Sequence, residues 1–140
     1  MLSAATHDHE LAEATRVAEI NALTAAGTFG ASLRATPEFT ALLAASAAMG
    51  ADPVAQAAIS AFNEKQEDYR VEAAMNLLSP DQGDELGRLL EEMYAVPSVV
   101  AYVAATTAFG DLCRETSAVI SGLIGIDFAA NSRSGGCCGG

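Results

Sequence analysis

The amino-acid sequence predicts an all-α protein, on three observations. Each of its four prolines stands where a helix can begin, at a position whose N–H would have no helical partner in any case. Between the prolines, apolar residues recur at helical spacing and no segment alternates as a strand would. Hydrophobic residues make up 51% of the chain, yet only 6% of residues are aromatic and many of the others are alanine, which favours closely packed helices. We expect a helical hairpin or bundle of about five helices with a long C-terminal helix.

The first expected helix covers residues 12–34. Its apolar positions include Val17, Ile20 and Leu23, which recur at helical spacing. Gly27 lies in the same segment and would let another helix approach closely, although a glycine inside a helix costs about 1 kcal/mol.

The next four helices are marked by their first residues. Three prolines follow a residue that can cap a helix, in the pairs Thr36-Pro37, Asp52-Pro53 and Ser79-Pro80. Gln82 stands three residues after Ser79 and completes a capping-box pattern. The fourth pair, Val96-Pro97, has no polar cap, but the proline still disfavours helical backbone at Val96.

The helix that begins at Pro53 is expected to extend to about residue 78. Ile59, Phe62 and Tyr69 lie on its apolar stripe, which a polar run at residues 63–68 interrupts. We interpret this run as a solvated face; the alternative is that it projects from the body and meets a partner. The helix that begins at Pro80 has its apolar residues at helical spacing, at Leu86, Leu89, Leu90 and Met93.

The last helix is expected to run from Pro97 to Ile124, about 40 Å at 1.5 Å per residue. One side carries Val100, Val103, Thr107, Gly110 and Cys113. A helix of this length exceeds what one small core needs, so we predict a homodimer. Residues 93–110 lack charges but contain Pro, Ser and Thr, and we interpret them as a buried helix without membrane insertion.

The domain organisation follows from these elements. Residues 1–128 form one all-α domain, and residues 129–140 form a flexible Gly- and Cys-rich tail. Cys137 and Cys138 stand between glycine pairs, where burial contributes little, so we predict that they ligate a metal or cluster or react with a partner's thiol. Two thiolates cannot fill a zinc or iron–sulfur site, so further ligands must come from a partner. Incidental cysteines are the remaining alternative. Cys113 is interpreted as a small buried hydrophobe.

Charge and motifs exclude several classes of function. The net charge is −11 and Lys65 is the only lysine, which argues against direct nucleic-acid binding. This charge indicates solubility or, alternatively, a basic partner surface. No basic residues precede an apolar stretch at the N-terminus, so we expect a cytoplasmic protein. The cluster at residues 7–10 (His-Asp-His-Glu) is interpreted as a solvated helix start, and no catalytic motif is present. We therefore expect a protein without enzymatic activity.

Several stretches together resemble the YlbF/YmcA family of bacterial regulators. They are "FGASLRATPEFTALLAASAAMGADPVAQAAISAFNEKQ", then "SPDQGDELGRLLEEMYAVPSVVAYVAA", and a last helix ending "ISGLIGIDFA". The resemblance covers roughly residues 15–128 and depends on helix starts and apolar pattern. At Val96 the chain departs from the family, which often has Asn before this proline.

The resemblance implies an all-α subunit that dimerises or joins related helical subunits. Members of the family influence sporulation, competence and biofilm development, and act with partners on mRNA maturation through an endoribonuclease. Their complexes have been associated with iron–sulfur clusters. The resulting hypothesis is a non-enzymatic regulatory adaptor in a complex, with Cys137 and Cys138 as ligands of a 4Fe-4S cluster or zinc shared with a partner. The alternative is a metal- or redox-handling protein whose cysteine tail is the functional element.

Overall fold

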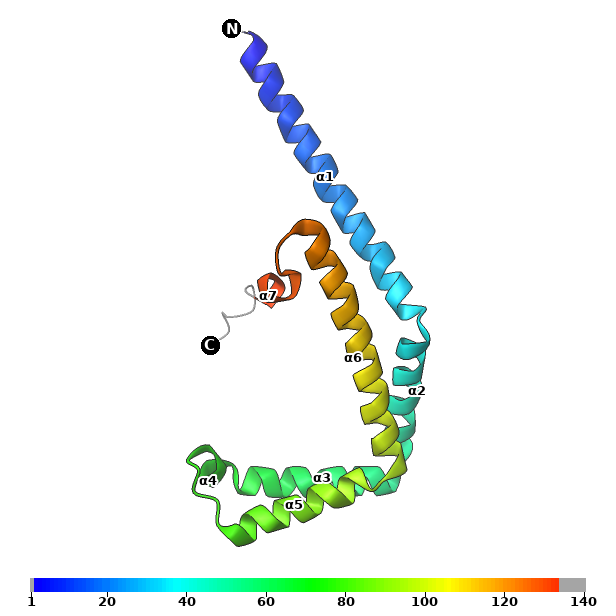
Figure 1. Ribbon diagram of the computed structural model, residues 1–140, viewed down its shortest axis with the longest axis vertical. Helices are drawn as coiled ribbons and strands as arrows, with labels where there is room; N and C mark the ends of the chain where they lie inside the picture. The colour runs from blue at the N-terminus through cyan, green and yellow to red at the C-terminus, as the bar shows by residue number, and fades with distance from the viewer. Residues whose placement is uncertain (1, 134–140) are drawn as a thin grey trace. The chain divides into compact units, whose positions relative to one another are not determined.

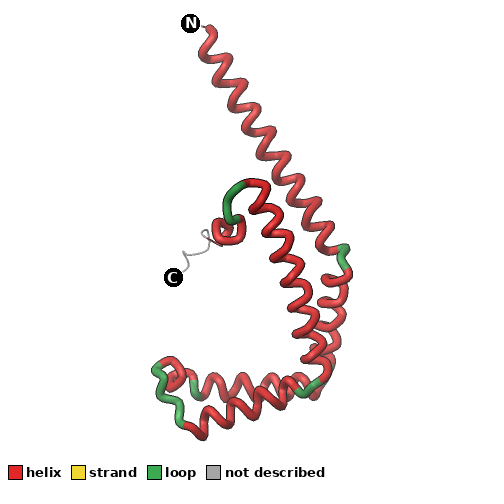
Figure 2. The backbone as a smooth tube through the Cα atoms, viewed as in Figure 1, coloured by secondary structure: helices red, strands yellow, loops and turns green. Residues whose placement is uncertain are grey.

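The computed structural model describes residues 2–133, and these residues form helices joined by short loops, with no strand (Figures 1 and 2). The helices are α1 (Leu2–Arg34), α2 (Pro37–Ala51), α3 (Pro53–Asp68), α4 (Arg70–Ala74), α5 (Pro80–Tyr94), α6 (Pro97–Ile124) and α7 (Phe128–Arg133). The predicted all-α class is confirmed, and the long helix α6 has the predicted bounds.

All four prolines begin a helix, as predicted. Thr36 accepts a hydrogen bond from a backbone N–H of the first turn of α2 at 3.3 Å. Ser79 and Gln82 form the predicted reciprocal capping box, with distances of 3.2 and 2.9 Å. Val96 precedes α6 in extended conformation without a side-chain cap. The prolines therefore mark the starts of α2, α3, α5 and α6.

Three segments differ from the sequence prediction. Helix α1 begins at Leu2, ten residues before the expected start at residue 12. The expected continuous helix from Pro53 to residue 78 is divided, because α3 ends at Asp68 and the short α4 follows. Residues 129–133, which were assigned to a flexible tail, belong to helix α7.

The contacts divide the chain into two compact units, a division that does not test the predicted domain over residues 1–128. The first ends at Thr40 and consists of α1 and the first turn of α2. The second begins at Ala41 and contains the remaining described helices. The described side chains of α1 are nearly all exposed, so the buried residues of the fold lie in the second unit.

Within the second unit, α3 and α5 pack as an antiparallel hairpin, with α4 at its far end (Figure 1). At the near end the chain bends sharply twice, by 82° between α2 and α3 and by 84° between α5 and α6. We call this place the corner (residues 52–55 and 96–99) and the far end the hairpin tip (residues 69–79). No single helix among the described residues meets the length and hydropathy of a membrane span; the two bent pairs meet them only jointly.

The buried core lies at the corner. Ala55 is fully buried, and Val96 and Val99 are 7% and 4% exposed. Met49, Ala58, Ile59 and Met93 pack against these three residues. Because Ala55 has a single methyl group, the helices that meet here can approach closely. Leu89 of the predicted α5 stripe is also buried.

Candidate functional site

The side chain of Asp52 links the two bends by hydrogen bonds. Its Oδ1 atom accepts hydrogen bonds from the backbone N–H groups of Val54 at 2.9 Å and Ala55 at 3.4 Å, which caps α3. Its Oδ2 atom accepts a hydrogen bond at 2.6 Å from the hydroxyl of Ser98, in the first turn of α6. One carboxylate thus serves two helix starts that are far apart in the sequence.

These hydrogen bonds also change the acidity of Asp52. The Ser98 hydroxyl is the largest cause that lowers the pKa of Asp52 below its usual value, and the N–H groups of Val54 and Ala55 add to it. Each of these donors favours the charged carboxylate over the neutral acid. Asp52 therefore stays ionised at the corner at neutral pH.

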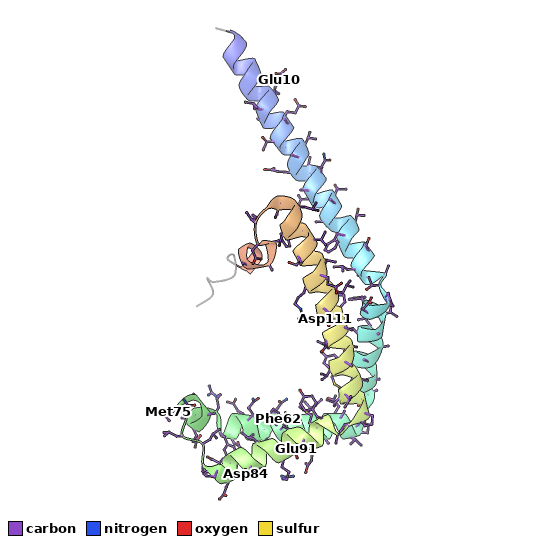
Figure 3. The ribbon with its side chains drawn as sticks, in the orientation of Figure 1. Glu10, Phe62, Met75, Asp84, Glu91 and Asp111 are labelled. Atoms are coloured by element: carbon purple, nitrogen blue, oxygen red, sulfur yellow. The ribbon has the colours of Figure 1, made fainter. Side chains whose placement is uncertain are left out.

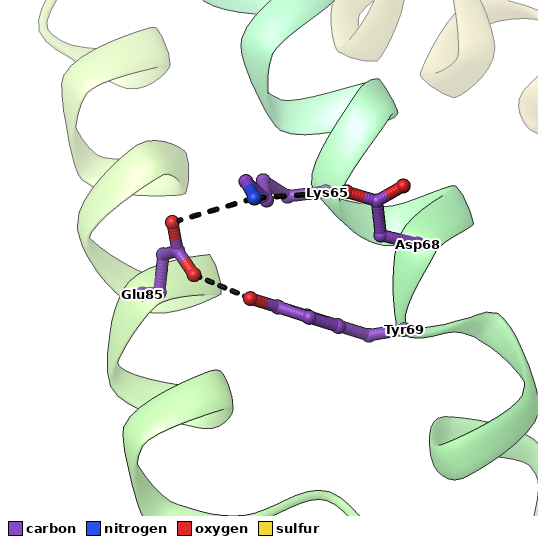
Figure 4. Close-up of polar contacts among 4 residues, drawn as sticks. All are labelled: Lys65, Asp68, Tyr69 and Glu85. Carbon is purple, nitrogen blue, oxygen red and sulfur yellow. Dashed lines mark hydrogen bonds and ion pairs between the residues drawn. The ribbon is translucent and has the colours of Figure 1, made fainter.

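A second polar cluster joins α3 to α5 near the hairpin tip (Figure 4). The Tyr69 hydroxyl donates a hydrogen bond of 2.6 Å to Oε2 of Glu85. Lys65 Nζ lies 4.0 Å from Oε1 of Glu85 and 3.6 Å from Asp68. The same ammonium lies 5.7 Å from the centre of the Tyr69 ring, within range of a cation–π contact. Part of the polar run at residues 63–68 therefore holds the hairpin together.

These contacts raise the pKa values of Tyr69 and Lys65. Accepting the hydrogen bond of Tyr69, the Glu85 carboxylate raises the pKa of that hydroxyl, and partial burial adds to the effect. The same carboxylate raises the pKa of Lys65 by its negative charge. Tyr69 stays neutral and Lys65 stays charged at neutral pH, so both keep the protonation states in which they contact Glu85.

Helix α6 exposes much of its apolar surface. Val100 and Val103, which the sequence placed on one side of this helix, are both exposed, and so are Val119 and Leu123 near its C-terminus. Val119 and Leu123 are four residues apart and so lie on one face. Val100 and Val103 point to a different side of α6 from Val119 and Leu123, because successive helical positions turn by about 100°. The helix therefore exposes two separate apolar patches, one near each end, and each can bind another protein.

A groove lies where the chain reverses after α6. Gly125 has φ of 71°, a left-handed conformation that ends the helix, and the Ser121 hydroxyl accepts a hydrogen bond of 3.0 Å from the N–H of Phe128. Helix α7 consequently packs back on α6. Between them is an open groove of about 980 Å³, lined by Cys113, Ser117, Ser121, Ile126 and Phe128 among others. Cys113 is half-buried there and is not the fully buried residue that we expected.

The predicted thiol site lies elsewhere in the sequence. Cys137 and Cys138 fall outside the residues that the structure describes, so it does not test their role. Among residues 9–130, whose side chains the structure describes, no group of three or more His, Cys, Asp or Glu is arranged to hold a metal ion. His9 and Glu10 are exposed on α1, which agrees with a solvated helix.

The sequence did not predict the two polar contacts between helices, Asp52 with Ser98 and Tyr69 with Glu85. It identified Asp52 only as the cap of α3, and it gave no role to Ser98 or to Glu85. Asp52 and Ser98 are 46 residues apart, and no spacing rule relates them. One signal was available in the sequence. The helix that begins at Pro97 has no polar cap at Val96, whereas Asp52 caps another helix and has a second carboxylate oxygen that can accept a hydrogen bond.

Comparison with known proteins identifies the family of this chain. The sequence model of the YlbF/YmcA family, described as control of competence regulator ComK, matches residues 22–124. The matched region includes the corner, the hairpin and all of α6, and it ends before α7. Neither a curated protein nor a solved structure gives a match. The family match covers more than half of the chain, so this protein belongs to the YlbF/YmcA family of regulators.

Proposed function

We propose that this protein is a non-enzymatic regulatory adaptor, which acts in the cytoplasm within a multisubunit complex that influences mRNA processing or developmental regulation. The observation that carries the proposal is the exposed apolar surface of α6. An adaptor needs surfaces for several subunits, and α6 leaves two apolar patches in solvent, Val100 with Val103 and Val119 with Leu123. Membership of a regulator family supports the same conclusion.

We propose that the complex contains a homodimer of this chain or a hetero-oligomer with related helical subunits, together with an endoribonuclease. Burial of the α6 valines against another helix would remove their apolar area from water at about 25 cal/mol per Å². The net charge of −11 supports a division of labour in which a partner, and not this chain, contacts RNA.

For the cysteine pair we propose a role as ligands of a 4Fe-4S cluster or zinc shared with a partner. Thiolates suit either group, and two of them leave at least two ligand positions for another chain. The described residues offer no preformed set of ligands, which is consistent with a site completed only on assembly. The cysteines lie beyond residues 22–124, the region of the family match.

The test of the adaptor is purification of the full chain from its native cells through an affinity tag. Recovery of a ribonuclease and of sister helical subunits is the expected result. Recovery of cluster-assembly or metal-transfer proteins instead would favour the alternative function, a metal- or redox-handling protein.

The cysteine pair is tested by purification without oxygen, alone and with co-expressed partners. Iron, zinc and acid-labile sulfide are measured for the wild type and for the double variant Cys137→Ser/Cys138→Ser. We expect the variant to lose the bound metal and to keep its stability within about 0.5 kcal/mol. Equal metal content in both proteins would remove the pair from the mechanism.

A further inference from the structure

We propose that the hairpin tip is a docking site for a partner protein that presents an apolar pocket with a basic rim. This inference rests on the adaptor function proposed above and specifies a second binding surface, separate from that of α6. The tip lies at the end of α3 and α5 opposite the corner (Figure 3).

The tip exposes a cluster of apolar side chains. Val71, Met75 and Leu77 are 58%, 56% and 65% exposed, and Leu78 is also exposed. Val71 and Met75 are four residues apart and so project from the same side of the short α4 segment. Single exposed apolar residues are ordinary on protein surfaces, whereas four within eight consecutive positions form a patch.

The backbone beneath this patch is held in place. Leu77 donates its N–H to the carbonyl oxygen of Glu72 at 2.8 Å, and Asn76 donates its N–H to that of Ala73 at 3.2 Å. Asn76 has φ of 55°, so the pattern is a Schellman ending of α4 with asparagine at the left-handed position. The hydrogen bond between Tyr69 and Glu85 fastens the base of the tip to α5. A partner would therefore meet a preorganised surface and lose little conformational entropy on binding it.

Charge determines which partner suits the tip. Residues 65–85 contain six acidic side chains and two basic ones. Arg70 pairs with Glu67 at 3.0 Å, and Lys65 lies near Asp68 and Glu85, so Glu72, Asp81 and Asp84 are the acidic side chains outside these pairs. Asp81 and Asp84 are exposed on the first turns of α5, and Figure 3 shows Asp84 at the same end of the hairpin as Met75. Such a rim repels nucleic acid and anionic lipid, and it attracts a protein surface with basic side chains around an apolar pocket.

The experiment places a photo-crosslinking amino acid at Met75 of the full chain in its native cells. Val54, which is 63% exposed at the corner end of the same hairpin, is the matched control position. Mass spectrometry should identify a partner peptide with net positive charge that is linked from position 75 and not from position 54. Links from position 75 to a second copy of this chain, links to lipid, or no links at all would each overturn the proposal.

A second arm uses the variant Met75→Glu/Leu77→Glu, with Met75→Leu/Leu77→Met as the conservative control. Circular dichroism first establishes that both variants keep the helical content of the wild type. With the identified partner purified, we expect the Glu variant to bind at least tenfold more weakly and the control to bind within twofold of the wild type. Equal binding by the Glu variant would contradict the docking site.

These outcomes separate the two proposals. If the wild type recovers no partner proteins from its cells, the adaptor function itself fails. If the wild type and the Glu variant recover the same partners in equal amounts, the adaptor function stands and the docking site at the tip is wrong.

Discussion

The corner and helix α6 use the same apolar residue types in opposite ways. Val99 is 4% exposed and belongs to the core, whereas the adjacent Val100 is 48% exposed. Both stand in the first turn of α6, so neither helix propensity nor hydropathy distinguishes them. Their difference comes from direction alone, because successive positions on a helix point about 100° apart.

This contrast shows where the stability of the isolated chain arises. A few small side chains at the corner, with the Asp52–Ser98 hydrogen bond, hold two sharp bends. Most other large apolar side chains of the described residues are open to solvent. The corner therefore maintains the fold, while the exposed valines of α6 are available to another chain.

The largest effect is expected from Val99→Asp. An unpaired carboxylate in the buried corner costs about 3 kcal/mol or more, a large share of the stability of a small domain. Val100→Asp, one residue further, should change the free energy of unfolding of the monomeric chain by about 0.5 kcal/mol or less. Urea denaturation followed by circular dichroism measures both, and equal losses would erase the distinction between corner and α6.

The exposed side of α6 is tested by the double variant Val100→Glu/Val103→Glu. Charges placed in an apolar interface should weaken the proposed dimer about 30-fold or more, equivalent to about 2 kcal/mol. Sedimentation velocity at micromolar concentration reports the change in mass. Ala101→Glu, which points to another side of the helix, should leave the mass unchanged. A wild type that is already monomeric would contradict the dimer.

A smaller effect is expected from the polar fastening of the corner. Because the folded pKa of Asp52 lies below the usual value of 3.8, its carboxylate stabilises the fold above that pH, and this stabilisation is lost as the pH falls through the folded pKa. Ser98→Ala removes the largest cause of the shift and should lower the melting temperature at pH 6 by about 4 °C.

The pH profile gives this prediction a control. The difference between the wild type and Ser98→Ala should shrink as the pH falls below 3.8 and through the folded pKa of Asp52, because Asp52 becomes protonated in the wild type. The variant Asp52→Asn cannot ionise at this position. Adding Ser98→Ala to it should therefore change the melting temperature by the same amount at every pH. A constant difference across the range would mean that Ser98 acts by packing alone.

The smallest effect is expected from Cys113→Ser. This side chain is half-buried and lines an open groove, so its new hydroxyl can reach water and the cost should remain below about 1 kcal/mol. Leu89→Ala, at a buried position of α5, should cost about 2 to 3 kcal/mol. Thermal unfolding of both variants checks the order, and a larger loss for Cys113→Ser would show that the groove is closed in solution.

The helix starts were predictable because their causes are local. Ser79, Gln82 and Pro80 act within one turn of one another, and so their effect can be read from adjacent letters. The break after Asp68 was missed because the apolar stripe continues through Tyr69 to Leu77, so the period alone indicates one helix. Asn76, which adopts the left-handed conformation, follows the end of α4. It was the local sign that helical backbone stops before residue 78.

The candidate site was less predictable, because it depends on which apolar surfaces remain uncovered. The sequence placed Val100 and Val103 on one side of α6 and correctly identified that helix. Whether this side faces the chain's own core depends on the bend of 84° between α5 and α6, which pairs of distant residues determine. The hydrogen bond from Ser98 to Asp52 is one such pair.

The two bends have a mechanical consequence. Helix α3 contains 16 residues, about 24 Å at 1.5 Å per residue, and it extends from the corner to the hairpin tip. The helix packs at its first turn on a few small side chains of the corner. A rotation of α3 by about 10° about the corner would therefore move the hairpin tip by about 4 Å. A change of one methyl group at Ala55 would thus be magnified at the opposite end of the hairpin.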